Sequence, residues 1–276
     1  MYPDFFSIHS LTIHSYGFFM ATGFTVALLM TTIRSKAQGI KPQQVLDMGV
    51  IVILWAIFGS RLTYVLINFP YFMNRPIDIL EVWKGGLVFS GGLIAVLLAM
   101  SWYLKRHHLS FWKSGDLWAP AVAIGQSIGH VGCFMAGCGY GKPTDIRLGV
   151  VFTHPQSLAP LNIPLHPTQL YSSLSGLIIF LVLMLLHTKK QFEGQVLLWL
   201  LILHSTAHLL IERFRGDNRG WVPGTDMSVT QFLTTLILIA SVAMLFVLKP
   251  KKKRTIIHHK TQDSSLRSQE VKGLSD

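Results

Sequence analysis

Seven long runs of apolar residues recur along this chain of 276 residues and constrain its fold more than any other feature. Runs of about 17–25 apolar residues match the hydrocarbon thickness of a bilayer. In hydrocarbon every backbone N–H and C=O must be bonded within the protein, so such runs form helices. We therefore predict an all-α, polytopic integral membrane protein with seven transmembrane helices, which cover Tyr16–Ile33, Val45–Ile67, Leu87–Leu104, Leu117–Phe134, Gln169–Leu186, Val196–Ile211 and Val229–Leu248.

The composition agrees with a membrane protein and excludes a large soluble domain. Half of the residues are hydrophobic and only 13% are charged, whereas soluble proteins carry about 25% charged residues. We predict one domain over 1–248 and a tail over 249–276, whose basic, polar composition indicates disorder. Because a basic run beside a span usually meets anionic headgroups, we expect the lipid bilayer as its partner and no nucleic acid.

Lysine and arginine set the expected orientation. With seven spans, alternate loops lie on opposite sides, and the 24 basic residues divide 16 to 8 between them. The richer side includes the tail and is the cytoplasmic side by the positive-inside rule. The N-terminus is then outside and the C-terminus cytoplasmic.

The segment Gly125–Thr144 combines polar and glycine residues at the end of an apolar run. It holds a histidine, two cysteines, a lysine and six glycines. A polar side chain in hydrocarbon is costly unless it is paired or lines a cavity, and glycine lets backbone approach a ligand closely. We infer a segment built around a ligand at the membrane edge. The spacing of Cys133 and Cys138 disfavours a mutual disulfide but leaves it open.

A second polar pattern lies in the sixth apolar run, where His204, His208 and Glu212 recur every four residues. This spacing places all three on one helix face. One interpretation is a metal site completed by His130, Cys133 and Cys138, but the cysteine spacing fits no compact zinc motif. We predict no metal. For His204, a hydrogen bond between helices is the simpler interpretation.

Two arginines are candidates for binding a phosphate. Arg215 follows Glu212 by three residues, so the two side chains can pair on one helix face. An arginine held at headgroup depth suits bidentate contact with a phosphate, although a solvated ion pair is the alternative. Arg61 lies inside an apolar run and needs a partner, which could be Glu212, a phosphate or water at the surface.

Two further motifs lie at helix entries. His166-Pro-Thr-Gln-Leu-Tyr171 opens the fifth run with a cluster of polar and aromatic groups. Ser90 precedes Gly91 and Gly92 at the entry of the third run, where a headgroup could reach backbone amides. The alternative for these glycines is close helix packing.

Taken in order, six motifs resemble the prolipoprotein diacylglyceryl transferase family of bacterial inner membranes. The resemblance extends along nearly the whole chain to about Leu248. Its motifs are His14-Ser-Tyr-Gly, Gly59-Ser-Arg-Leu-Thr-Tyr, Trp83-Lys-Gly-Gly-Leu-Val-Phe-Ser-Gly-Gly-Leu, Gly129–Lys142, His166-Pro-Thr-Gln-Leu-Tyr and Glu212-x-x-Arg215.

The resemblance implies seven helices in the bacterial inner membrane, with the N-terminus outside. It implies transfer of the diacylglyceryl group of phosphatidylglycerol to the lipobox cysteine of a preprolipoprotein, with release of glycerol phosphate and no cofactor. The chain departs from the family pattern at several places. Ser90 replaces a histidine, His130 and His208 replace arginines, and Cys133 and Cys138 stand where the family has asparagine and an acid.

On this basis we expect one polar cavity open to the outer leaflet. His130 and His208 are the acid/base candidates, and Tyr16 and Glu212 orient groups in the cavity. A second hypothesis is a catalytically altered paralogue that binds phospholipid or a membrane partner, and a third is a metal or proton transporter. The residues expected to bind the lipid headgroup are Arg61, Ser90, Gly91, Gly92, Gly137, Gly141, Lys142, His166 and Arg215.

Overall fold

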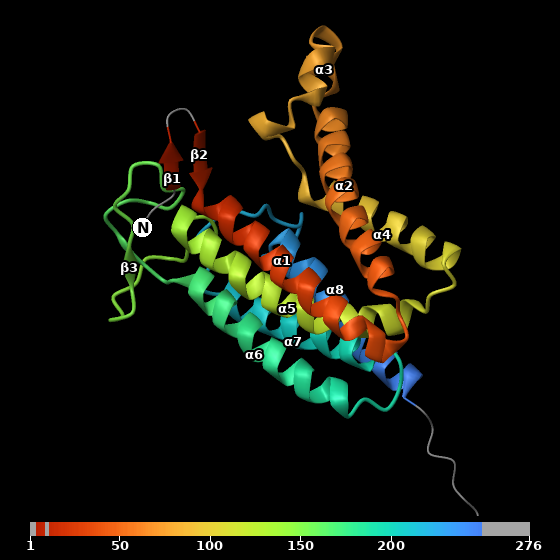
Figure 1. Cartoon of the computed structure of the whole chain (residues 1–276). Helices are drawn as coiled ribbons and strands as arrows, with labels where there is room; N and C mark the ends of the chain where they lie inside the picture. The colour runs from red at the N-terminus through yellow and green to blue at the C-terminus, as the bar shows by residue number, and fades with distance from the viewer. Residues whose placement is uncertain (1–3, 9–10, 250–276) are drawn as a thin grey trace, which may run out of the picture.

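The computed structural model describes residues 4–8 and 11–249, and within them the chain is mostly helical (Figure 1). Each predicted apolar run coincides with one long helix, and the ends differ by a few residues. The largest difference is at α5, which begins at Phe111 rather than Leu117 because Ser110 caps it by accepting a hydrogen bond from the Lys113 amide. The long helices are α1 (Ser15–Ser35), α2 (Pro42–Ile67), α4 (Phe89–Arg106), α5 (Phe111–Ala136), α6 (Thr168–Thr188), α7 (Gln195–Glu212) and α8 (Val229–Leu248).

Five of these helices, α1, α2, α6, α7 and α8, are long and apolar enough to cross a membrane by length and composition. The other two are equally long but more polar. Helix α4 ends on Lys105 and Arg106, and α5 includes Lys113 and Asp116. The count of seven spans therefore stays a prediction. The tail predicted over 249–276 lies outside the described residues from Pro250 onward.

The fold is mostly helical, as expected, and two pairs of short strands lie outside the helices. Strand β1 (Asp4–Ile8) pairs antiparallel with β2 (Leu11–His14), and β3 (Val150–Val151) pairs antiparallel with β4 (Pro164–Leu165). Segments too short to form a helix satisfy their backbone groups by this pairing. A short helix α3 (Phe69–Asn74) and the 3-10 turns Lys36–Gln38, Pro76–Leu80 and Val82–Lys84 complete the elements.

The helices form two groups, which diverge in Figure 1. Helix α5 packs against α1, α6 and α7, and α8 packs against α7, whereas α2 pairs with α4. Glycines allow that pairing, because a Cβ on Gly91 would lie 1.9 Å from Thr63 Oγ1 and one on Gly92 would lie 2.3 Å from Ser60 Oγ. Gly91 and Gly92 are thus buried between helices, which is a correction to their expected role at a headgroup.

The two groups meet where the short turns connect α1 to α2 and α4 to α5. Val45 of α2 and Leu117 of α5 are fully buried there against Ile40. We call the opposite end, which carries residues 137–167 and 213–228, the loop end. Helices α2 and α4 diverge from the other helices toward the loop end (Figure 1). The side chains of α2 and α4 on that side are therefore separated from the bundle formed by α5, α6 and α7.

A buried carboxylate fixes the start of α7. Asp116 has no exposed surface and accepts hydrogen bonds from the amides of Gly194 (2.8 Å), Val196 (2.9 Å) and Leu197 (3.0 Å). The amides at the start of a helix have no partner within the helix, and a negative charge there is favourable. Asp116 therefore sets the position of α7 relative to α5, and with it the face of α7 that carries His204, His208 and Glu212.

Candidate functional site

A pocket of about 170 Å³, here called the polar pocket, lies between α5, α6, α7 and the segment after α7. The four-residue spacing on α7 correctly predicted that His204, His208 and Glu212 share a face, since all three line this pocket. The other polar side chains that line it are Gln126, His130, Ser172, Ser175, Arg215 and Arg219.

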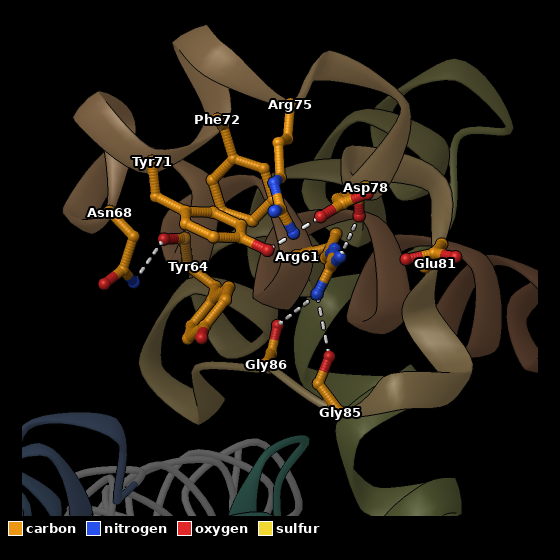
Figure 2. Close-up of a pocket in the computed structure, with 10 residues that line it drawn as sticks. All are labelled: Arg61, Tyr64, Asn68, Tyr71, Phe72, Arg75, Asp78, Glu81, Gly85 and Gly86. Carbon is orange, nitrogen blue, oxygen red and sulfur yellow. Dashed lines mark hydrogen bonds between the residues drawn. The ribbon is translucent and has the colours of Figure 1, made fainter.

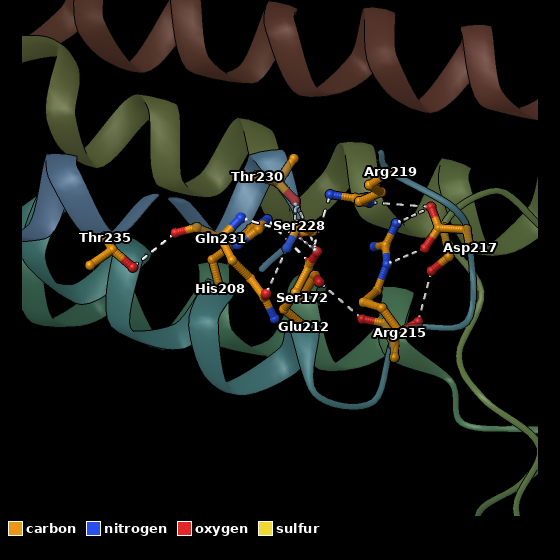
Figure 3. Close-up of polar contacts among 12 residues, drawn as sticks. Ser172, His208, Glu212, Arg215, Asp217, Arg219, Ser228, Thr230, Gln231 and Thr235 are labelled. Atoms are coloured by element: carbon orange, nitrogen blue, oxygen red, sulfur yellow. Dashed lines mark hydrogen bonds and ion pairs between the residues drawn. The ribbon is translucent and has the colours of Figure 1, made fainter. Parts of the chain in front are cut away.

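Glu212 is the carboxylate that lines this pocket, and Figure 3 shows its polar contacts. It is 8% exposed, and its Oε1 accepts hydrogen bonds from Ser228 Oγ (3.0 Å) and Thr230 Oγ1 (2.8 Å) at the start of α8. Its Oε2 lies 3.9 Å from His208 Nε2 and 3.8 Å from Arg219 Nη1. A carboxylate held in this way can orient an imidazole and a guanidinium on opposite sides of one site.

Arg215 pairs with Asp217 and not with Glu212, which corrects the sequence-based expectation. Nε and Nη2 of Arg215 each donate to one oxygen of Asp217, both at 2.8 Å. Helix α7 ends at Glu212, so the helical spacing on which the predicted pair depended does not reach Arg215. Burial would raise the pKa of Asp217, but the hydrogen bonds and charge of Arg215, with the charge of Arg219, outweigh burial and hold this pKa below its ordinary value.

The glycine-rich loop after α5 positions Arg215. Gly137 ends α5 with φ +79°, and Gly139, at φ +65°, lies against the guanidinium, where a Cβ would be 2.8 Å from Arg215 Nη2. Gly141 and Arg215 form an isolated antiparallel bridge, in which the Lys142 amide donates to the Phe214 carbonyl at 2.8 Å. Gly139 and Gly141 thus bring their backbone against Arg215, and the positive φ of Gly139 and this close approach both favour glycine.

The start of α6 supports the same loop. The His166 amide donates to the Lys142 carbonyl (3.0 Å), and the His166 Nδ1 lies 3.4 Å from the Tyr171 hydroxyl. Two polar residues of the same motif also hold the loop, since Thr168 Oγ1 donates to the Gly139 carbonyl (2.7 Å) and Gln169 Nε2 donates to the Cys138 carbonyl (3.0 Å). The structure thus brings the predicted residues of this loop, His166 and Arg215 together.

A second hollow, here called the apolar groove, has a volume of about 410 Å³ and lies between α1, α2 and α5. Gln126 and His130 of α5 line both the apolar groove and the polar pocket. The predicted residue Tyr16 lines the groove and not the polar pocket. The side chains that the groove shares with no other hollow described here are mostly apolar and include Met20, Phe24, Val52 and Val122.

Arg61 lies in a different hollow, also of about 410 Å³, between α2, α3 and the turns that follow (Figure 2). It is 8% exposed, its Nε donates to the Ile79 carbonyl at 2.9 Å, and its Nη1 donates to the Gly85 carbonyl at 2.7 Å. Its remaining hydrogen bonds go to the carbonyls of Asp78 and Gly86. The expected convergence of Arg61 with Arg215 is not found, because α2 and α4 diverge from the bundle. Ser90, on α4, is exposed.

The two cysteines are free thiols, and the Cys138 Sγ lies 3.6 Å from the Cys133 carbonyl. Within residues 4–8 and 11–249, no three histidine, cysteine, aspartate or glutamate side chains are arranged so that they could hold a metal ion. The alternative metal site therefore finds no set of ligands in this part of the chain.

Comparison with known proteins identifies the family. Residues 3–247 match the profile of the family described as prolipoprotein diacylglyceryl transferase. The chain belongs to the prolipoprotein diacylglyceryl transferase family. It is 33% identical over 242 residues to the phosphatidylglycerol–prolipoprotein diacylglyceryl transferase of Clostridium tetani, which covers 88% of this chain and 96% of that protein. It is 34% identical over 248 residues to the protein of the same name from Vibrio vulnificus, which covers 88% and 90%.

Some charged residues at the candidate site of this family member were not predicted from the sequence. Arg219 and Asp217 lie in the irregular segment between α7 and α8, where no periodicity marks them. The only available signal was their proximity in sequence to Arg215. Ser228 could have been recognised as the cap of α8, since it accepts a hydrogen bond from the Gln231 amide.

Proposed function

We propose that this chain transfers the diacylglyceryl group of phosphatidylglycerol to the lipobox cysteine of a preprolipoprotein. Family membership and the names of the relatives support the proposal. The structural observation that carries it is that Gln126 and His130 line both the apolar groove and the polar pocket. An apolar hollow and a charged one on either side of the same two residues suit a phospholipid, whose tails and headgroup need opposite surroundings.

In this arrangement the acyl chains occupy the apolar groove and the phosphate occupies the polar pocket. The thiolate of the acceptor attacks the glyceryl carbon that bears the phosphate. A carbon–sulfur bond forms, the carbon–oxygen bond breaks, and glycerol phosphate leaves with the electron pair. A base must remove the thiol proton because the thiolate is the nucleophile. The candidates for proton transfer are His130, which lines both hollows, and His208, whose Nε2 lies 3.9 Å from Glu212 Oε2.

The membrane topology that we propose has seven spans, with the N-terminus outside and the C-terminus in the cytoplasm of a bacterium. The division of basic residues supports this orientation. The loop end, with the polar pocket, then faces the outer leaflet of the inner membrane. A fusion reporter placed at each terminus tests it, and reporters active on the same side would refute the odd number of spans.

The function is tested by reconstitution of the purified chain with phosphatidylglycerol vesicles and a lipobox peptide. We expect a diacylglyceryl thioether on the peptide and release of glycerol phosphate in equal amounts. Replacement of the peptide cysteine by serine is the control. Complementation of a strain depleted of its own transferase tests the same activity in cells.

The second candidate function is phospholipid or partner binding without transfer. The observation that favours it is that His130 and His208, which the sequence analysis places where the family has arginines, line the pocket that would bind phosphate. Neutral imidazoles hold an anion less strongly than guanidiniums. Phospholipid that copurifies with a well-folded protein that makes no thioether would favour this candidate.

A further inference from the structure

The two guanidiniums of the polar pocket are held very differently (Figure 3). Arg215 has a side chain 9% exposed and makes two hydrogen bonds of 2.8 Å with Asp217. Arg219 has a side chain 26% exposed, and its contacts are longer, 3.3 Å from its Nε to Asp217 and 3.8 Å from its Nη1 to Glu212. Strong hydrogen bonds between charged groups are about 2.7–2.9 Å long, so the contacts of Arg219 are weaker than those of Arg215. Arg215 is thus committed to Asp217, and Arg219 is not committed to either carboxylate.

Arg219 also stands between two spaces. It lines the polar pocket and a larger cleft of about 830 Å³ at the loop end, here called the loop cleft. Glu212 and Arg215 are the other residues that line both. A side chain in this position can contact a headgroup whose phosphate is in the polar pocket and whose glycerol extends into the loop cleft.

The balance of charge decides which arginine can receive a phosphate. Glu212 and Asp217 already compensate the two guanidiniums, so an incoming phosphate ester has to compete with a carboxylate. If Arg215 turned to the phosphate, Asp217 would lose two short hydrogen bonds. If Arg219 turned, Asp217 would keep Arg215, and Glu212 would keep the hydroxyls of Ser228 and Thr230. An unpaired buried carboxylate is costly, so the second exchange is the favourable one.

We propose that Arg219 binds the phosphate ester of the lipid headgroup and exchanges its carboxylate partners for that phosphate when the lipid enters. Arg215 then serves as the fixed cation that keeps Asp217 in place. This assignment rests on the proposed function, because it names the residue that recognises the anionic part of the proposed substrate. The planar guanidinium allows two parallel hydrogen bonds to phosphate oxygens, which an ammonium cannot make.

The variants Arg219→Ala and Arg219→Lys test the assignment, with Arg147→Ala as the matched control. Arg147 is an exposed arginine of the loop end, and it lines neither the polar pocket nor the loop cleft. In the vesicle assay we expect Arg219→Ala to raise the KM for phosphatidylglycerol about 10- to 100-fold, the usual effect of losing a charged hydrogen-bond donor. The KM for the peptide should stay within about twofold of wild type, and Arg219→Lys should recover only part of the loss.

Chemical rescue distinguishes direct binding from a structural effect. Because the loop cleft is open, guanidinium ion at millimolar concentration should lower the KM of Arg219→Ala toward wild type and should have no effect on Arg147→Ala. A KM for phosphatidylglycerol within about twofold of wild type in Arg219→Ala would overturn the assignment. An equal rise in KM for Arg147→Ala would overturn it as well, since the loss of any positive charge at the loop end would then explain the effect.

A binding measurement decides the assignment even if the wild type makes no thioether. Phosphatidylglycerol in nanodiscs and free glycerol phosphate are the two probes, measured at equilibrium on the full chain. We expect Arg219→Ala to weaken both by a similar factor. Weaker binding of glycerol phosphate alone would show a site for free phosphate esters and would overturn the lipid assignment. An inactive wild type whose phosphatidylglycerol binding depends on Arg219 would refute the transferase function and leave the assignment standing.

Discussion

Replacing Gly139 by alanine should separate the geometry of Arg215 from the general stability of the loop. The added Cβ would lie 2.8 Å from Nη2, 2.9 Å from Nη1 and 3.1 Å from Cζ of Arg215. All three distances are below or at the edge of ordinary contact, and they involve a guanidinium held by Asp217. The side chain must move away, and the two hydrogen bonds of 2.8 Å to Asp217 must lengthen or break.

The magnitude has two parts. Gly139 has φ +65°, and an alanine in this left-handed region costs about 1 kcal/mol. Loss of the charged hydrogen bonds adds about 1.5–3 kcal/mol. We therefore expect Gly139→Ala to lower the free energy of unfolding by about 2.5–4 kcal/mol. Because Arg215 keeps Asp217 in place beside the proposed phosphate site, we also expect its displacement to reduce kcat/KM by about 10- to 100-fold, where each 1.4 kcal/mol of lost transition-state stabilisation is about a factor of ten.

The matched control is Gly224→Ala. Gly224 has φ +78° and lies in the segment between α7 and α8, but a Cβ there would meet no atom within 4 Å. It should show the conformational cost of about 1 kcal/mol alone and keep its kcat/KM. The assay is thioether formation in phosphatidylglycerol vesicles, with thermal unfolding in detergent as the measure of stability. Equal losses of activity in Gly139→Ala and Gly224→Ala would refute the reasoning, as would a Gly139→Ala protein with wild-type kinetics.

Three further predictions concern parts away from this contact. Asp116→Ala should lower the free energy of unfolding by about 3 kcal/mol, because three amide groups at the start of α7 lose a buried acceptor. Thermal unfolding measures this loss of stability, and a change below about 1 kcal/mol would contradict the capping role of Asp116. The lowered pKa of Asp217 means that its carboxylate stabilises the fold above the unfolded pKa of about 4, and that this contribution is lost as pH falls through the lower folded pKa. In acid titrations of stability, Asp217→Asn should lack this loss at low pH, and a titration identical to wild type would exclude the contribution of Asp217. Arg61→Ala should speed tryptic cleavage after Lys84, since Arg61 holds the carbonyls of Ile79, Gly85 and Gly86. An unchanged cleavage rate on gels would show that the segment keeps its conformation without Arg61.

The sequence was a good guide wherever regular helices decide the geometry. The apolar runs predicted the helices because hydrocarbon requires that backbone groups bond internally. The four-residue spacing of His204, His208 and Glu212 predicted a shared face, and the three side chains line one pocket. For Gly91 and Gly92 the correct interpretation was the alternative of close packing.

The predictions from sequence were wrong where contacts between distant residues, or irregular backbone, determine the position of a side chain. The separation of Arg61 from Arg215 depends on where α2 and α4 diverge, which depends on contacts near Val45 and Leu117 and on no local signal. The pairing of Arg215 with Asp217 depends on the end of α7, and helix ends are poorly marked by periodicity. Arg219 reaches the pocket from an irregular segment, whose path no residue pattern predicts.

The divergence of α2 from α1 and α5 has a consequence for the lipids that such a protein can use. Val52 is the only α2 residue that borders the apolar groove, and the other residues that line it belong to α1 and α5. In the proposed arrangement, acyl chains in a groove that α2 covers so little leave their distal carbons in the surrounding membrane. Tail length and unsaturation should then matter little, and the fatty acids attached to the acceptor should mirror whatever mixture the host cell makes.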